Sequence, residues 1–99
     1  MAQDDSDHRE RVGPVLQTGI VADAIIAAIK QLNAEAVVVD RGAYRRVLVP
    51  QRCLVTRAAM EEQLGRSVYF PADLETVMPA FKGRLTVTAD SAVWQAGPL

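Results

Sequence analysis

The one histidine of the chain lies in its most acidic stretch. His8 is surrounded by four carboxylates, at Asp4, Asp5, Asp7 and Glu10. Imidazole and carboxylate groups bind transition metals, and a histidine is also the usual base that activates a serine nucleophile. Either chemistry needs these groups in a fixed geometry, and a segment this polar cannot bury enough surface to become ordered. We therefore expect residues 1–11 to be a disordered acidic tail, without a metal site or a catalytic base.

The other reactive side chains lack the partners that catalysis needs. Cys53, the single cysteine, sits in the apolar run "RCLV", which favours a buried, inert thiol over a reactive one. Asp40 precedes Arg41 and Gly42, an order typical of a turn-forming aspartate rather than a catalytic acid. Glu61 and Glu62 are adjacent on a predicted helix and point in different directions, so they do not form a carboxylate pair. None of these side chains therefore has the partner residues that a catalytic arrangement requires.

The composition describes one folded domain. The chain has 99 residues, of which 49% are hydrophobic and 23% charged, and this length suits a single core. The net charge of −1 argues against nucleic acid as a partner, because neutralising phosphates needs a clustered excess of Lys and Arg. No apolar run approaches the ~20 residues that span a bilayer, and the amino terminus has no apolar signal core. We expect a cytoplasmic protein that does not bind membranes.

Apolar spacing and capping signals predict an α+β fold. Thr56 is a suitable N-cap and Gly65 a suitable C′ residue for one helix, and Pro71 and Pro79 delimit another. Expected strands are residues 12–19, 36–40, 44–49 and 52–57 and a final hairpin within 84–95; expected helices are 20–32, 57–65 and 71–78. These elements make two β-α-β-β-like halves of a single compact domain, residues 12–96, with short helices packed on antiparallel sheet.

The run Ala36–Asp40 is apolar at consecutive positions. This pattern predicts a central strand covered on both faces, or a strand covered by the first helix. The chain then turns and returns through Tyr44–Val49, where Arg45 and Arg46 point to opposite faces and so do not form one basic patch. Tyr44 and these arginines are either ordinary sheet surface or part of a face that a partner grips.

An ordered set of short segments resembles a known family. The segments are "VGPVLQTG", "VDRGAYRRV", "LVTRAAMEEQLGR" and "DLETVMPAFKGRL". They resemble the effector, or coupling, proteins of bacterial multicomponent di-iron monooxygenases, above all those of the toluene and alkene monooxygenase branch. Methane monooxygenase component B and the phenol hydroxylase effector are more distant. The resemblance runs in unbroken order from Val12 to Trp94.

The resemblance implies a cofactor-free regulatory protein that is not itself an enzyme. Effectors of this kind bind the α-subunit of a di-iron hydroxylase over its active site, and they tune oxygen activation, substrate access and coupling. They alternate there with a ferredoxin or reductase electron donor. In this family the segment before the last hairpin, here residues 77–84, lies against the hydroxylase, and we expect the free protein to be a monomer without iron. The candidate contact residues, including those of the first hairpin, are Arg41, Tyr44, Arg45, Val77, Met78, Ala80, Phe81, Lys82 and Arg84.

Other interpretations stay open at this stage. The main alternative is a stand-alone ligand-binding or protein-interaction domain of similar fold, and another is a small enzyme with a site built from Tyr44, Asp40 and the arginines. Val77 and Phe81 are equally consistent with ordinary core positions. An effector is expected to be encoded beside hydroxylase subunits, a ferredoxin and a reductase.

Overall fold

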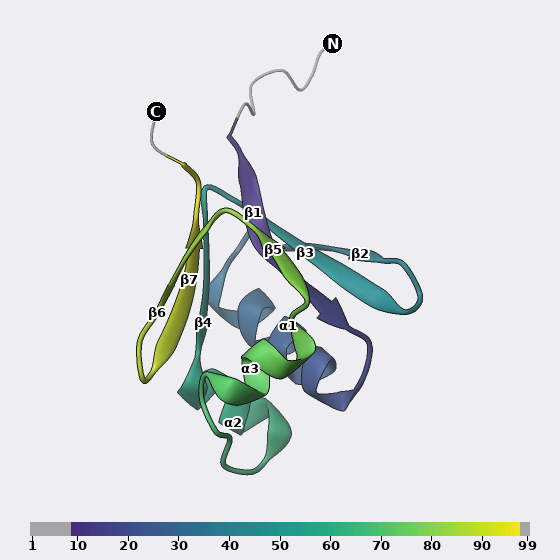
Figure 1. Ribbon diagram of the computed structural model, residues 1–99, viewed down its shortest axis with the longest axis vertical. Helices are drawn as coiled ribbons and strands as arrows, with labels where there is room; N and C mark the ends of the chain where they lie inside the picture. The colour runs from purple at the N-terminus through teal and green to yellow at the C-terminus, as the bar shows by residue number, and fades with distance from the viewer. Residues whose placement is uncertain (1–8, 98–99) are drawn as a thin grey trace.

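Seven strands and three helices make up a computed structural model of the chain, which describes residues 9–97 (Figure 1). The strands are β1 (Arg11–Gln17), β2 (Val37–Asp40), β3 (Tyr44–Pro50), β4 (Arg52–Thr56), β5 (Ala80–Lys82), β6 (Arg84–Val87) and β7 (Ser91–Gln95). The helices are α1 (Ile20–Leu32), α2 (Arg57–Leu64) and α3 (Ala72–Val77). All strand pairs are antiparallel, and the predicted α+β class is confirmed.

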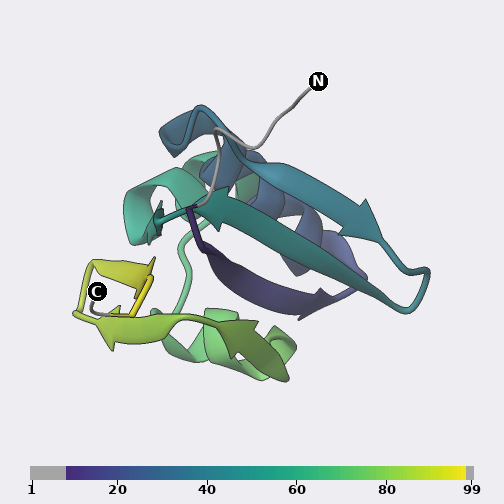
Figure 2. The ribbon, with the colours of Figure 1, turned by 90° about the horizontal axis from the view of Figure 1, so that it is seen from above.

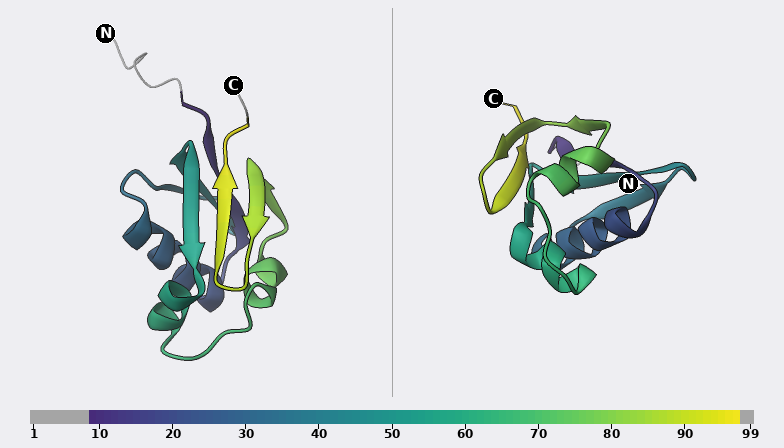
Figure 3. Two further views of the ribbon diagram at one scale, coloured as in Figure 1. Left: turned by 90° about the vertical axis from the view of Figure 1, so that its left-hand side faces the viewer. Right: turned by 60° about the horizontal axis from the view of Figure 1, so that its bottom comes forward.

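The strands form two sheets rather than one. One sheet has the order β2-β3-β1-β5, and the other has the order β4-β7-β6, seen face-on in the left view of Figure 3. Strand β5 comes late in the sequence but pairs with β1, so the chain crosses from the first sheet to the second at Gly83. The two predicted halves are therefore joined through a shared sheet.

The core lies between α1 and the inner faces of the two sheets. Its largest fully buried side chains include Trp94, Leu16, Ile25, Met60 and Leu74. Helix α1 has the predicted bounds and lies beneath β2 and β3, as Figure 2 shows from above. Both of its end residues are exposed, Ile20 by 79% and Leu32 by 40%.

Asn33 ends α1 and joins it to the second sheet. Its side-chain amide donates hydrogen bonds to the Ile29 carbonyl at 2.7 Å and to the Leu54 carbonyl at 2.8 Å. Its side-chain oxygen accepts the backbone N–H of Leu54 at 3.0 Å. Since β4 is an edge strand, Asn33 satisfies backbone groups that no neighbouring strand pairs.

The predicted caps of α2 are confirmed. The Thr56 hydroxyl accepts the backbone N–H of Ala59 at 3.1 Å, and Gly65 adopts a left-handed conformation with φ of 69° after the last turn. Both features satisfy backbone groups that a helix leaves unpaired at its ends. Local signals alone were therefore enough to place this helix.

The boundary of the predicted acidic tail is wrong by several residues. Strand β1 begins at Arg11, and the Glu10 carbonyl accepts the backbone N–H of Gln51 at 2.7 Å. The guanidinium of Arg9 forms an ion pair with Glu35 at 3.0 Å. Polar side chains thus do not prevent Arg11 from joining the sheet or the Glu10 backbone from bonding to Gln51. The remainder of the predicted tail, with His8, lies outside the described residues.

Candidate docking surface

The turn between β2 and β3 is held by the aspartate that the sequence assigns to it. The Asp40 carboxylate accepts the backbone N–H of Gly42 at 2.8 Å, and the Gly42 carbonyl accepts the Thr18 hydroxyl at 2.6 Å. An aspartate that binds the backbone two residues on is a common turn former. The turn-forming interpretation of Asp40 is therefore confirmed, and Arg41 lies exposed in this turn.

Arg45 points toward α1 rather than toward solvent. Its guanidinium contacts Asp23 of α1 at 2.6 Å and lies 4.0 Å from Asp40. Because successive side chains of a strand alternate between faces, Tyr44 and Arg46 point to the other side of the sheet. Arg45 therefore fastens β3 to α1, whereas its two neighbours face outward.

The predicted contact segment 77–84 is part helix end and part strand. Val77 and Met78 are partly buried and pack against the core, and Ala80, Phe81 and Lys82 form β5 along β1. All three β5 residues are exposed, Phe81 by 46%. The sequence predicted no strand at residues 80–82, so β5 is an addition to the expected elements. A three-residue strand has no alternating pattern of its own, and its pairing with β1 depends on residues more than 60 positions away.

The register of the sheet sorts the candidate residues by face. Phe81 lies opposite Pro14, which is fully buried, and so shares the inner face. Ala80 and Lys82 lie on the other face, which Arg46 shares because both Ala80 and Arg46 lie opposite Val15. We call this the open sheet face. Its members are Val15, Val37, Val39, Tyr44, Arg46, Leu48, Ala80 and Lys82.

No helix among the described residues covers the open sheet face. In Figure 2 α1 lies behind β2 and β3, and no helix lies in front of them. Val38 packs against the core, whereas Val37 and Val39 on either side of it do not. Of the two arrangements predicted for this strand, the central position with both faces covered is wrong, because β2 lies at the edge of its sheet. The alternative, a strand covered by the first helix, is confirmed, because α1 lies behind β2.

Sequence reasoning missed four members of the open sheet face, Val15, Val37, Val39 and Leu48, and left Arg46 open as either ordinary sheet surface or part of a contact face. The signal that could have identified them was the run of consecutive valines in β2, for which the sequence allowed either two covered faces or cover by the first helix alone. A single edge strand with apolar residues on both faces gives the same pattern. The candidate Arg84, by contrast, is exposed at the start of β6 in the other sheet.

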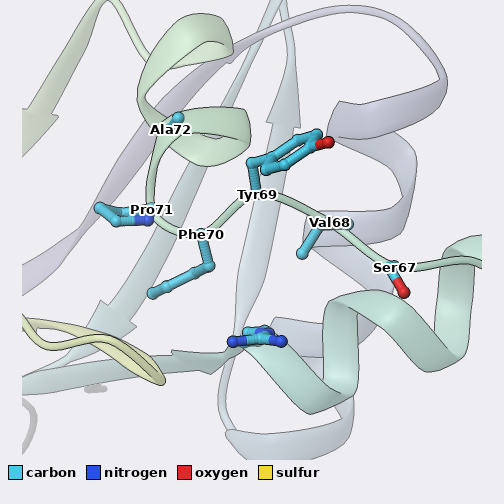
Figure 4. A pocket seen from close by; sticks show the side chains of 7 residues that line it. Ser67, Val68, Tyr69, Phe70, Pro71 and Ala72 are labelled. Carbon is cyan, nitrogen blue, oxygen red and sulfur yellow. The ribbon is translucent and has the colours of Figure 1, made fainter.

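A shallow pocket of about 490 Å³ lies between α2 and α3 (Figure 4). The connection that lines it is held at Val68, whose backbone N–H donates to Glu61 at 3.0 Å. This hydrogen bond lowers the pKa of Glu61, and Arg57, 3.3 Å away, lowers it further. Arg57 is thus already engaged where it lines the pocket. Tyr69, which also lines the pocket, is 83% exposed, and its ring lies on the opposite side of the connection from that of Phe70 in Figure 4.

The described residues bring no catalytic set together. Cys53 is fully buried, and burial raises the pKa of its thiol to about 12, so the expectation of an inert thiol is supported. Within residues 9–97, no group of three His, Cys, Asp or Glu side chains lies close enough to hold a metal ion. Tyr44 and Asp40 lie on opposite faces of the hairpin by register. No described helix is long and apolar enough to cross a membrane.

The fold and this surface define a small α+β protein with one sheet face that no described helix covers. The chain belongs to the MmoB/DmpM family, whose model matches residues 10–95. It is 40% identical over 93 residues to the effector subunit of the alkene monooxygenase system of Xanthobacter autotrophicus, a match that covers 92% of this chain and 90% of that protein.

A solved structure has the same fold. A chain in the phenol hydroxylase–regulatory protein complex superposes with a TM-score of 0.78 at 20% sequence identity. The match covers 88% of this chain and 98% of that one, so nearly all of the described elements have counterparts there.

Proposed function

We propose that this protein is the effector component of a multicomponent monooxygenase. It binds the di-iron hydroxylase over the active site of the α-subunit and tunes oxygen activation, substrate access and coupling, without a cofactor and without catalysing the reaction itself. The main support is the 40% identity to an effector subunit over nearly the full length of both chains. An effector works because it binds one hydroxylase conformation better than another, and an exposed binding face is what such a mechanism requires.

The contacts that we propose centre on β5 and the β2–β3 hairpin. Ala80, Phe81 and Lys82 are exposed on β5, and Arg41 and Tyr44 are exposed on the hairpin. Among the other candidates, Arg45 and the pair of Val77 and Met78 act indirectly, because they fasten β3 and the start of β5 to the core. Arg84 extends the contact along β6.

The same proposal covers the organisation of the complex. The free protein is a cytoplasmic monomer, and it shares hydroxylase surface with a ferredoxin or reductase electron donor. The effector and the donor therefore alternate on the hydroxylase during turnover.

Reconstituted turnover tests the proposed function. A hydroxylase, ferredoxin and reductase, which we expect to be encoded beside this chain, are assayed for product formed per NADH consumed, with increasing amounts of the protein. A saturable rise in the rate or in the coupling of NADH to product supports an effector. An unchanged rate and an unchanged coupling at every concentration contradict it.

A further inference from the structure

We infer that the open sheet face is the surface that receives the hydroxylase, and that the matching hydroxylase patch is apolar at its centre and acidic at its rim. This inference rests on the proposed function and extends it to residues of β1, β2 and β3. It also states the chemistry of the partner.

The open sheet face carries apolar side chains that no described helix covers. Val39 lies opposite Arg46, and Val15 lies between Arg46 and Ala80, so one row of outward side chains crosses all four strands. In the neighbouring row Val37 lies opposite Leu48. The four aliphatic side chains of these rows on β1, β2 and β3 do not pack against the core, and Val37 is 46% exposed. The solvated face of an antiparallel sheet is normally polar, and an exposed apolar patch with a polar rim marks an interaction site.

The charged side chains of the open sheet face are cationic. Arg46 and Lys82 lie on the open sheet face, and the structure describes no ion pair for either of them. No carboxylate occurs among the outward residues of β1, β2, β3 and β5, since Asp40 points to the inner face with Arg45. Complementary charge across an interface favours the correct partner and speeds association. A hydrophobic patch edged by Asp or Glu is therefore the surface that fits.

Contacts within the chain hold the open sheet face in place before a partner binds. The Arg45–Asp23 ion pair fastens β3 to α1 from below, and the Thr18 N–H donates to the Ala43 carbonyl at 3.1 Å. A surface that is ordered before binding loses little conformational entropy on association. The face also continues into Ala80 and Lys82 of β5, two residues that the proposed function already assigns to the hydroxylase.

The helical end of the molecule supplies a matched control. It carries exposed apolar side chains of its own, with Ile20 at 79% and Tyr69 at 83% exposure, but its exposed charges include the carboxylates of Glu62 and Glu75. If exposed apolar area alone selected the partner, this end would serve equally well. The inference requires the cationic face instead.

The experiment measures hydroxylase affinity by fluorescence anisotropy for two matched sets of variants. The face set is Arg46→Glu, Val37→Asp and Tyr44→Ala, and the control set is Arg66→Glu, Ile20→Asp and Tyr69→Ala. We expect each charge-introducing face variant to weaken the complex about tenfold or more and each control variant to change it less than about twofold. Raising the salt concentration should weaken the wild-type complex more than the Arg46→Glu complex, because salt screens exposed charges.

The possible outcomes separate a failure of this inference from a failure of the proposed function. If the control set weakens binding and the face set does not, the inference is overturned while the proposed function stands. If the wild-type chain neither binds nor stimulates the hydroxylase, the proposed function fails and the inference fails with it. Melting curves exclude misfolding, and Arg46→Glu keeps the test valid if Val37→Asp does not fold. Sedimentation of the free chain as a dimer that Val37→Asp dissociates would instead assign the face to a second copy.

Discussion

Asn33 is a single side chain that joins two elements. It satisfies the end of α1 through Ile29 and the edge of β4 through both backbone groups of Leu54. We predict that Asn33→Ala lowers the free energy of unfolding by about 1–3 kcal/mol, because the Leu54 groups lose their partners in a partly buried place. Thermal unfolding measures this as a drop of several degrees. Gln31→Ala, at an exposed position of the same helix, is the control, and an equal effect of the two substitutions would contradict the role of Asn33.

Strand β1 depends on the absence of a Cβ atom at Gly13. Gly13 has φ of +149°, and a Cβ placed there would lie 2.3 Å from the Val47 carbonyl oxygen. We predict that Gly13→Ala prevents β1 from pairing with β3 and causes a loss of stability above about 3 kcal/mol. Gly42→Ala, where φ is +80° but the space is open, should cost only about 1 kcal/mol. Circular dichroism melts compare them, and similar melting temperatures for the two would refute the close approach.

The connection between α2 and α3 depends on the ionised form of Glu61. The Val68 N–H holds the pKa of Glu61 below its usual value, so its stabilising effect is present above the unfolded pKa of about 4.3 and is lost as pH falls through the folded pKa. We predict that Glu61→Gln lowers the melting temperature at pH 7 and that its difference from wild type shrinks below about pH 4. Glu62→Gln, at the next position of the same helix, is the control for the loss of one carboxylate charge. A constant difference for Glu61→Gln from pH 7 to pH 3 would contradict this assignment.

Local signals in the sequence were enough for the helices but not for the sheet edges. Helix α1 has its predicted bounds, and Thr56 and Gly65 cap α2 as expected, because these features depend on neighbouring residues. Strand β5 was missed because Ala80–Lys82 gains its conformation only from β1. The consecutive valines of β2 left two arrangements open, and only cover by α1 on one face is confirmed, because an apolar run does not by itself show how many faces are covered. The part of the candidate site that the sequence did not predict is thus the part that depends on pairing between distant strands.

At the scale of the whole molecule, the open sheet face proposed for binding is separate from the helix and the inner sheet faces that form the core. The core lies between α1 and the two sheets, and the sheet β2-β3-β1-β5 turns its other side outward. Both ends of the described chain lie at one end of the molecule, opposite α2 and α3 (Figure 1). Binding of the hydroxylase at the open sheet face, as proposed, would leave the helical end with α2 and α3 accessible. A fluorophore attached there, for example through Tyr69→Cys, can report binding without blocking the face.

Binding to the hydroxylase is the central claim, and sedimentation velocity with the labelled chain tests it most directly. The labelled protein, of 10.8 kDa, is mixed with the resting hydroxylase in the absence of ferredoxin and reductase. The account predicts that the label sediments with the hydroxylase in a saturable complex and that excess electron donor displaces it. A label that sediments as the free chain at every hydroxylase concentration, while the same hydroxylase preparation is active, would contradict the account.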